Sequence, residues 1–139
     1  MTLVNAKPST IDIDFTIPSE NCDEFERAMK AVQPGFRVDV FRDGAVFVTV
    51  LPDDYLEKSK PIATNLKNID LRALDPVDII ITKIARLDRR DEQDIESCIT
   101  NFQVTQKQIE RRAKDMSNAG NDEVFANNLK TVLERFFSS

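Results

Sequence analysis

With 139 residues, of which 41% are hydrophobic and 31% charged, the chain has the composition of one ordinary globular domain, not of a disordered, fibrous or membrane protein. Its 19 Lys and Arg against 24 Asp and Glu give a net charge of −5, which argues against binding nucleic acid or anionic membranes through the overall field. The absence of histidine excludes Ser-His and Cys-His nucleophile pairs and imidazole zinc sites. Catalysis therefore has to use carboxylates, Lys, Arg, hydroxyl groups or a bound cofactor, and magnesium is the leading candidate metal.

Targeting signals are missing from the sequence. No apolar run reaches the ~18–20 residues of a membrane helix, and residues 1–10 lack the basic-then-apolar layout of a signal peptide. We therefore expect a cytoplasmic protein that does not bind membranes. In that compartment, Cys22 and Cys98 are expected to be reduced and packed, not bridged.

The first half of the chain is predicted to contain most of the strands. Residues 11–17 alternate strictly between apolar and polar, which predicts a strand with one buried face. A helix is predicted from Ser19 to the Pro34-Gly35 stop. Residues 36–41 and 45–50 are predicted to form a hairpin around Arg42-Asp43-Gly44. Residues 51–68 are predicted to be a loop or a short helix, and residues 69–74 a brief strand.

From residue 75 onward the spacing of apolar residues changes from two to about 3.6. Asp75 is predicted to cap a helix that has Pro76 in its first turn and ends near Leu87. Three more helices are predicted: near residues 91–102, from Thr105 to a break at 117–121, and over the C-terminal segment. The whole pattern predicts a single α+β domain over residues 1–139. It has a small mixed sheet in residues 1–74 and helices from residues 75–139 gathered at one side.

Three acidic residues in the predicted strands suggest a metal site. Asp12 and Asp14 are two residues apart on one strand, so both carboxylates leave the same face, where they repel unless a cation lies between them. Asp39, on the next predicted strand, is the natural third ligand. The alternative is a solvated sheet face, on which alternating polar residues are common.

A second group of charged residues lies in the helical half. Residues 83–90 hold four cations and one acid, and Lys83 borders the apolar stripe of its helix, where it could reach a phosphate in a cleft. Asp91 and Asp94 lie four residues before Ile95 and Cys98, so they face partly inward. The alternative for both acids is helix capping and favourable charge in the first turn.

Taken together, these segments resemble a known superfamily. The residues that carry the resemblance are Ser9-Thr10-Ile11-Asp12-Ile13-Asp14-Phe15, Val38-Asp39-Val40-Phe41, Leu74-Asp75-Pro76-Val77-Asp78-Ile79-Ile80-Ile81-Thr82-Lys83 and Arg90-Asp91-x-x-Asp94-Ile95. Over about residues 6–102 the chain resembles the nucleotidyltransferase-like superfamily. Within it, the chain is most similar to small prokaryotic proteins related to the toxin component of abortive-infection toxin–antitoxin systems.

The resemblance implies a function and assigns roles to residues. It implies Asp12, Asp14 and Asp39 as catalytic ligands of magnesium or manganese, Lys83 as a phosphate contact, and Asp91 and Asp94 as further residues of the nucleotide cleft. The implied activity is transfer of a nucleoside monophosphate from a nucleoside triphosphate to a hydroxyl group of RNA, protein or a small molecule. The implied partners are a second copy of the chain or an antitoxin.

One feature of the superfamily is missing. Its members carry a Gly-Gly or Gly-Ser helix start roughly a dozen residues or more before the Asp pair, where backbone amides hold the triphosphate, and residues 1–8 contain no glycine. Either the true N-terminus lies upstream, or the chain is a reduced member. The alternative to an enzyme is therefore a catalytically reduced nucleotide- or partner-binding module. A third alternative is a small acidic domain unconnected with nucleotides.

Overall fold

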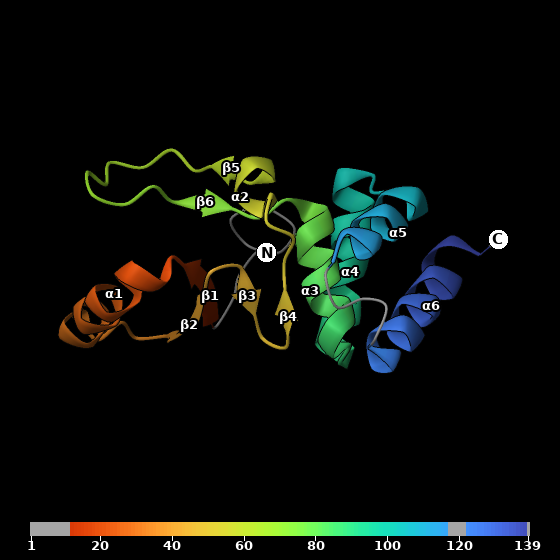
Figure 1. The fold of residues 1–139 in the computed structure, drawn as a ribbon, viewed down its shortest axis with the longest axis horizontal. Coiled ribbons are helices and arrows are strands. Elements are labelled where there is room, and N and C mark those ends of the chain that lie inside the picture. The colour runs from red at the N-terminus through yellow and green to blue at the C-terminus, as the bar shows by residue number, and fades with distance from the viewer. Residues whose placement is uncertain (1–11, 117–121, 139) are drawn as a thin grey trace.

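The computed structural model describes residues 12–116 and 122–138. Ile11 and the predicted helix break at residues 117–121 lie outside the described residues. The elements follow in the order β1 (Asp12–Ile17), α1 (Ser19–Val32), β2 (Arg37–Arg42), β3 (Ala45–Val46), β4 (Thr49–Val50), α2 (Tyr55–Lys58), β5 (Lys60–Pro61), β6 (Arg72–Ala73), α3 (Pro76–Arg86), α4 (Arg89–Phe102), α5 (Gln106–Asp115) and α6 (Glu123–Phe137). The α+β class is confirmed, with α1 and the strands at one end of the molecule and α3 to α6 at the other (Figure 1).

The first strand, helix and second strand form a parallel β–α–β unit. β1 and β2 pair in parallel, with Asp14 opposite Asp39. α1 covers one face of this pair, because the rings of Phe15 and Phe25 meet edge to face with centroids 5.3 Å apart. The predicted helix from Ser19 is confirmed, and it packs on these strands.

The predicted hairpin around Asp43-Gly44 is wrong. β2 pairs with β1, whereas β3 and β4 form a separate antiparallel pair. The reason is that the turn bonds back to β1: the Asp43 N–H donates to the Ile17 carbonyl at 3.1 Å, and the Gly44 N–H donates to Thr16 Oγ1 at 2.8 Å. Gly44 has φ +82° and lies against the Tyr55 ring, 2.8 Å from where a Cβ would be, so a larger residue would be strained here.

Among the residues that the structure describes, three two-stranded sheets take the place of the single mixed sheet that we predicted. Besides β1–β2 and β3–β4, the short strands β5 and β6 pair antiparallel, with Lys60 opposite Ala73. The segment between β5 and β6 extends away from α3 to α6 and lies above α1 in the view of Figure 1. Its residues 63–70 are exposed.

The helices of the second half begin and end close to the predicted positions because each has a local N-terminal cap. Asp75 accepts from the Val77 N–H at 2.9 Å and caps α3. Asp88 and Thr105 form capping boxes at the starts of α4 and α5, and Asp122 accepts from the Phe125 N–H at 3.0 Å. α3 is the central helix, against which α4, α5 and α6 all pack.

Two hydrophobic clusters stabilise these elements. The larger one fills the helical half around fully buried isoleucines such as Ile80, Ile84 and Ile95, each worth roughly 1.5–3 kcal/mol of burial free energy. The smaller one consists of Val46, Leu51 and Tyr55, and Leu74 packs against both clusters.

Both cysteines are buried and are not joined in a disulfide, as expected, and burial raises the pKa of the Cys98 thiol to about 11. Within residues 12–116 and 122–138, every helix is too short or too polar to cross a bilayer.

Candidate functional site

The three strand acids share one face of the β1–β2 pair. Side chains two residues apart on a strand point the same way, so Asp12 and Asp14 lie on the face opposite Phe15. Asp39 is the cross-strand partner of Asp14 and points to the same side. Since Phe15 contacts α1, the acidic face points away from that helix, towards the side where β3, β4 and α3 lie.

Asp14 is the electrostatic centre of this face. Burial raises its pKa above the ordinary 3.8, and the negative charges of Asp12 and Asp39 raise it further. The positive charges of Lys83 and Arg86 oppose this shift, which means that both α3 side chains act on the same carboxyl group. The charges of the sheet acids and of the helix cations therefore both act on Asp14.

The donor chemistry of the acidic face fits a hard divalent cation, since three carboxylates repel one another unless a cation neutralises them. Their spacing fits less well. In the part of the chain that the structure describes, no three acidic or cysteine side chains are gathered closely enough to hold a metal ion. Asp39 instead forms an ion pair with Arg37, with Nη2 to Oδ2 at 2.8 Å. The arginine of this pair is exposed to solvent, which screens the attraction, so Asp39 can leave Arg37 at little cost in stability.

Lys83 connects the helix acids to this face. Its Nζ lies 3.2 Å from Asp94 Oδ2 and 3.5 Å from Asp91 Oδ1, and its side chain is only 13% exposed. A cation held this far from solvent by two carboxylates is strongly oriented. Lys83 thus contacts both helix acids that were predicted to line the nucleotide cleft. Its charge also acts on Asp14.

Asp91 also has a structural role. It is fully buried, and its Oδ2 accepts from the Asp88 N–H at 3.1 Å as part of the α4 capping box. Burial alone would raise its pKa, but the hydrogen bonds from Arg86 and from the Asp88 backbone, with the charge of Lys83, bring the pKa below its ordinary value. The capping alternative and the cleft alternative are therefore both compatible with this residue.

Sequence reasoning missed Arg86 as a site residue. Its Nε and Nη2 donate to the two oxygens of Asp91 at 2.7 and 2.6 Å. Its guanidinium carbon lies 4.2 Å from the centroid of the Phe47 ring. The spacing was a usable signal, because Arg86 is three residues after Lys83 and therefore lies on the same helix face. The neighbouring Arg89 and Arg90 are exposed.

A second buried ion pair lies away from this face. Arg112 of α5 donates from Nε and Nη2 to the two oxygens of Asp78 on α3, at 2.5 and 2.9 Å, and from Nη1 to Asp54 at 2.6 Å. Burial raises the pKa of Asp78, and the hydrogen bond from Arg112 opposes this. The network ties α5 to α3 and to the start of α2.

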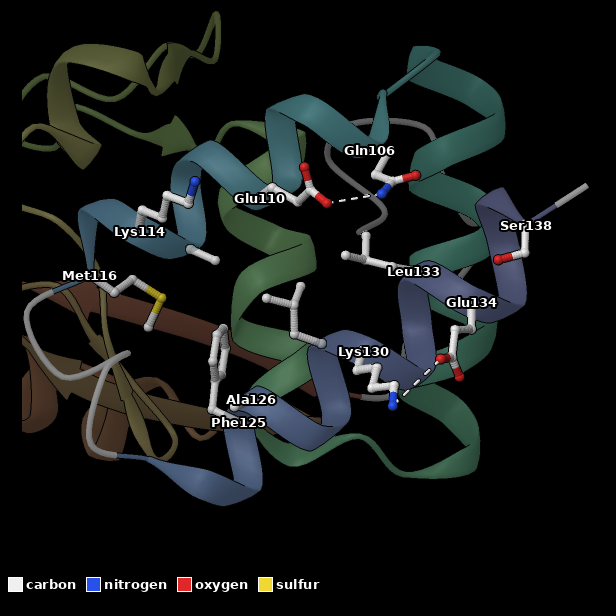
Figure 2. Close-up of a pocket in the computed structure, with 12 residues that line it drawn as sticks. Gln106, Glu110, Lys114, Met116, Phe125, Ala126, Lys130, Leu133, Glu134 and Ser138 are labelled. Carbon is white, nitrogen blue, oxygen red and sulfur yellow. Dashed lines mark hydrogen bonds and ion pairs between the residues drawn. The ribbon is translucent and has the colours of Figure 1, made fainter.

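A cavity of about 740 Å³ lies between α5 and α6 (Figure 2). Phe125 and Leu133 contribute to its apolar wall, while the Lys130–Glu134 ion pair and the Gln106–Glu110 hydrogen bond lie along its rim. None of the predicted site residues lines it. A smaller hollow of about 260 Å³ on the α1 side of β2 is lined by Glu26, Met29, Lys30, Val38, Asp39 and Val40.

The comparisons with known proteins bear on the whole chain. The family described as "Nucleotidyltransferase of unknown function (DUF6036)" matches residues 3–138. Searches among curated proteins and among solved structures gave no significant match. The matched range takes in all six residues of the predicted site and every helix and strand of the described residues. The chain therefore belongs to this family of nucleotidyltransferases of unknown function.

Proposed function

We propose that the protein transfers a nucleoside monophosphate from a nucleoside triphosphate to a hydroxyl acceptor, with Mg²⁺ or Mn²⁺ as cofactor. The observation that carries the proposal is the combination of opposite charges around Asp14: Asp39 lies opposite it on β2 and Asp12 two residues before it on β1, and the charges of Lys83 and Arg86 of α3 act on it. A metal and a triphosphate need this combination, because the metal requires carboxylate oxygens and the phosphates require cations.

In this proposal each residue has a separate task. Asp12 and Asp14 hold the metal ion, which when bound neutralises phosphate charge. Asp39 completes the metal site after leaving Arg37 and accepts the proton of the attacking hydroxyl. Lys83 and Arg86 bind phosphate oxygens. The acceptor oxygen forms a bond to the α-phosphorus while the bond from that phosphorus to the pyrophosphate oxygen breaks, and pyrophosphate leaves.

A second candidate function is favoured by the Arg37–Asp39 ion pair, which occupies the third acid at 2.8 Å. In that case the protein is a reduced module that binds a nucleotide, a second copy or an antitoxin-like partner without transferring anything. In that case Asp14, Lys83 and Arg86 bind the ligand and take no part in a transfer reaction. The two candidates differ in whether pyrophosphate is released.

The deciding experiment offers the protein each of the four nucleoside triphosphates, labelled at the α-phosphate, with Mg²⁺ and with pools of RNA, protein or small hydroxyl compounds. We expect label to enter one acceptor pool with one pyrophosphate released per label transferred. The double variant Asp12→Asn, Asp14→Asn should abolish transfer. The matched control Asp53→Asn, which changes an exposed acid elsewhere, should retain it. Triphosphate binding without transfer would favour the second candidate. Neither binding nor transfer would contradict the transferase and the nucleotide-binding form of the second candidate.

A further inference from the structure

The β3–β4 turn places an aromatic ring in an unusual backbone conformation. Val46 and Thr49 pair across the turn, so Phe47 and Val48 are its two central residues. Phe47 has φ +54°, which is a left-handed value. Where the first central residue of such a turn has a left-handed φ, it is normally glycine. For a bulky side chain this conformation costs on the order of 1–3 kcal/mol and persists only when surrounding contacts hold it.

Two contacts hold the Phe47 ring. One is with Phe41 of β2, whose ring meets it edge to face with centroids 5.0 Å apart. The other is with Arg86, whose guanidinium carbon lies 4.2 Å from the ring centroid, within the range of a cation–π interaction. The strained turn thus presents one ring face to an arginine at the end of α3.

Arg86 is fixed from two directions as a result. Asp91 binds Nε and Nη2 in the plane of the guanidinium, and Phe47 covers its face. Among the described residues, no acceptor takes a hydrogen bond from Nη1, although the side chain is 36% exposed. The N–H groups of Arg86 Nη1 are therefore oriented and available to a ligand. The charge of the same guanidinium acts on Asp14.

We propose that Phe47 is a positioning residue of the nucleotide site: its ring holds the Arg86 guanidinium in the orientation that keeps Nη1 available to a phosphate oxygen. This inference rests on the proposed function, because it assumes that the triphosphate binds at the Asp14 face. The proposed role also explains why an aromatic residue occupies a turn position at which glycine would adopt the same backbone conformation without strain. The strain is retained because the ring is needed beside Arg86.

The test compares three variants in the full chain. Phe47→Leu keeps an apolar side chain but removes the ring, Phe47→Tyr keeps the ring, and Val48→Leu changes the exposed neighbour in the same turn. A non-hydrolysable nucleoside triphosphate with Mg²⁺ is titrated into each protein. We expect Phe47→Leu to bind about tenfold more weakly, and Phe47→Tyr and Val48→Leu to bind like the wild type.

A second readout follows Arg86 itself, without nucleotide. The Nε–H resonance of Arg86, assigned by its loss in Arg86→Lys, should carry the ring-current shift of the Phe47 face. Phe47→Leu should remove that shift and Phe47→Tyr should preserve it. A Phe47 ring that does not lie over the Arg86 guanidinium in solution would leave this resonance unchanged.

The outcomes separate this inference from the function on which it rests. If the wild type does not bind the triphosphate, the nucleotide site is refuted and the inference with it. If the wild type binds and Phe47→Leu binds equally well, the inference alone is refuted. It is also refuted if Phe47→Tyr loses as much affinity as Phe47→Leu, or if affinity falls while the Arg86 resonance stays where it was.

Discussion

Lys83 and Asp14 lie on different elements of the fold, yet the positive charge of the lysine opposes the rise in pKa that burial causes in the aspartate. Lys83 is simultaneously held by Asp91 and Asp94 of α4. It therefore links the acids of the two-stranded sheet to those of the helical half. Through Lys83, the strand acids and the charged residues of α3 and α4, which were predicted from sequence as two groups, interact electrostatically.

Binding of a divalent metal should stabilise the protein. At a Mg²⁺ or Mn²⁺ concentration 100 times the Kd, the free energy of unfolding should rise by about 2.7 kcal/mol. Thermal unfolding measures this as a higher Tm. The double variant Asp12→Ala, Asp14→Ala should show a much smaller rise, whereas Asp53→Asn should behave like the wild type. Equal rises in the wild type and the double variant would count against the site.

Metal affinity should also depend on pH in a way set by Asp14. A metal binds the ionised carboxylate, and the pKa of Asp14 lies above 3.8 because of burial and the charges of Asp12 and Asp39. Affinity should therefore begin to fall at a higher pH than an ordinary aspartate would cause. Titrations between pH 7 and pH 4 measure this. Constant affinity down to the ordinary pKa would contradict the assignment of Asp14 as a ligand.

Replacing Lys83 should weaken triphosphate binding. Lys83→Met keeps most of the apolar stem and removes the charge, so we expect a loss of about 1.5–3 kcal/mol, the scale of a hydrogen bond to a charged group. Lys107→Met, an exposed lysine on α5, is the matched control and should bind normally. Unchanged affinity in Lys83→Met would mean that the lysine serves only Asp91 and Asp94.

Asp91 should contribute stability at neutral pH and lose that contribution in acid. Its pKa in the folded protein lies below 3.8, so the contribution is fully present above that value and disappears as pH falls through the folded pKa. Asp91→Asn should cost about 1.5–3 kcal/mol at pH 7. Denaturant unfolding at pH 7 and pH 3 should show the gap to the wild type closing. A gap of the same size at both pH values would refute this.

The Arg112–Asp78 pair should behave as a structural element. Arg112→Met leaves a buried carboxylate unpaired and should cost about 3–5 kcal/mol of stability. The double variant Arg112→Met, Asp78→Leu removes both charges and should recover most of this loss. Urea unfolding of the single and double variants gives both values. A double variant that is no more stable than Arg112→Met would show that packing, not charge, is what Arg112 supplies.

The helical half could be predicted from sequence because its signals are local. Asp75 before Pro76 defines a helix start, and Asp88 and Thr105 form capping boxes with residues only three positions away. The alternation of β1 likewise gave its two faces. Such patterns depend on a few neighbouring residues, so they predict local structure without knowledge of the tertiary contacts.

The pairing of the strands could not be predicted in the same way. Asp43-Gly44 has the composition of a hairpin turn, but its N–H groups bond back to β1, which depends on a distant segment. Phe47 breaks the predicted 45–50 strand through a left-handed conformation that its residue type does not signal. The contact of Phe47 with Arg86 is also long-range, so no local pattern in the sequence indicates it.

The most direct test of the account is calorimetric titration of a non-hydrolysable nucleoside triphosphate, with and without Mg²⁺, into the wild type, Asp14→Asn and Asp53→Asn. If the sheet acids and α3 cations form one metal–nucleotide site, the wild type and Asp53→Asn bind with Mg²⁺ and much more weakly without it, and Asp14→Asn loses that dependence on the metal. No heat from the wild type at millimolar ligand, or the same Mg²⁺ dependence in Asp14→Asn, would contradict it.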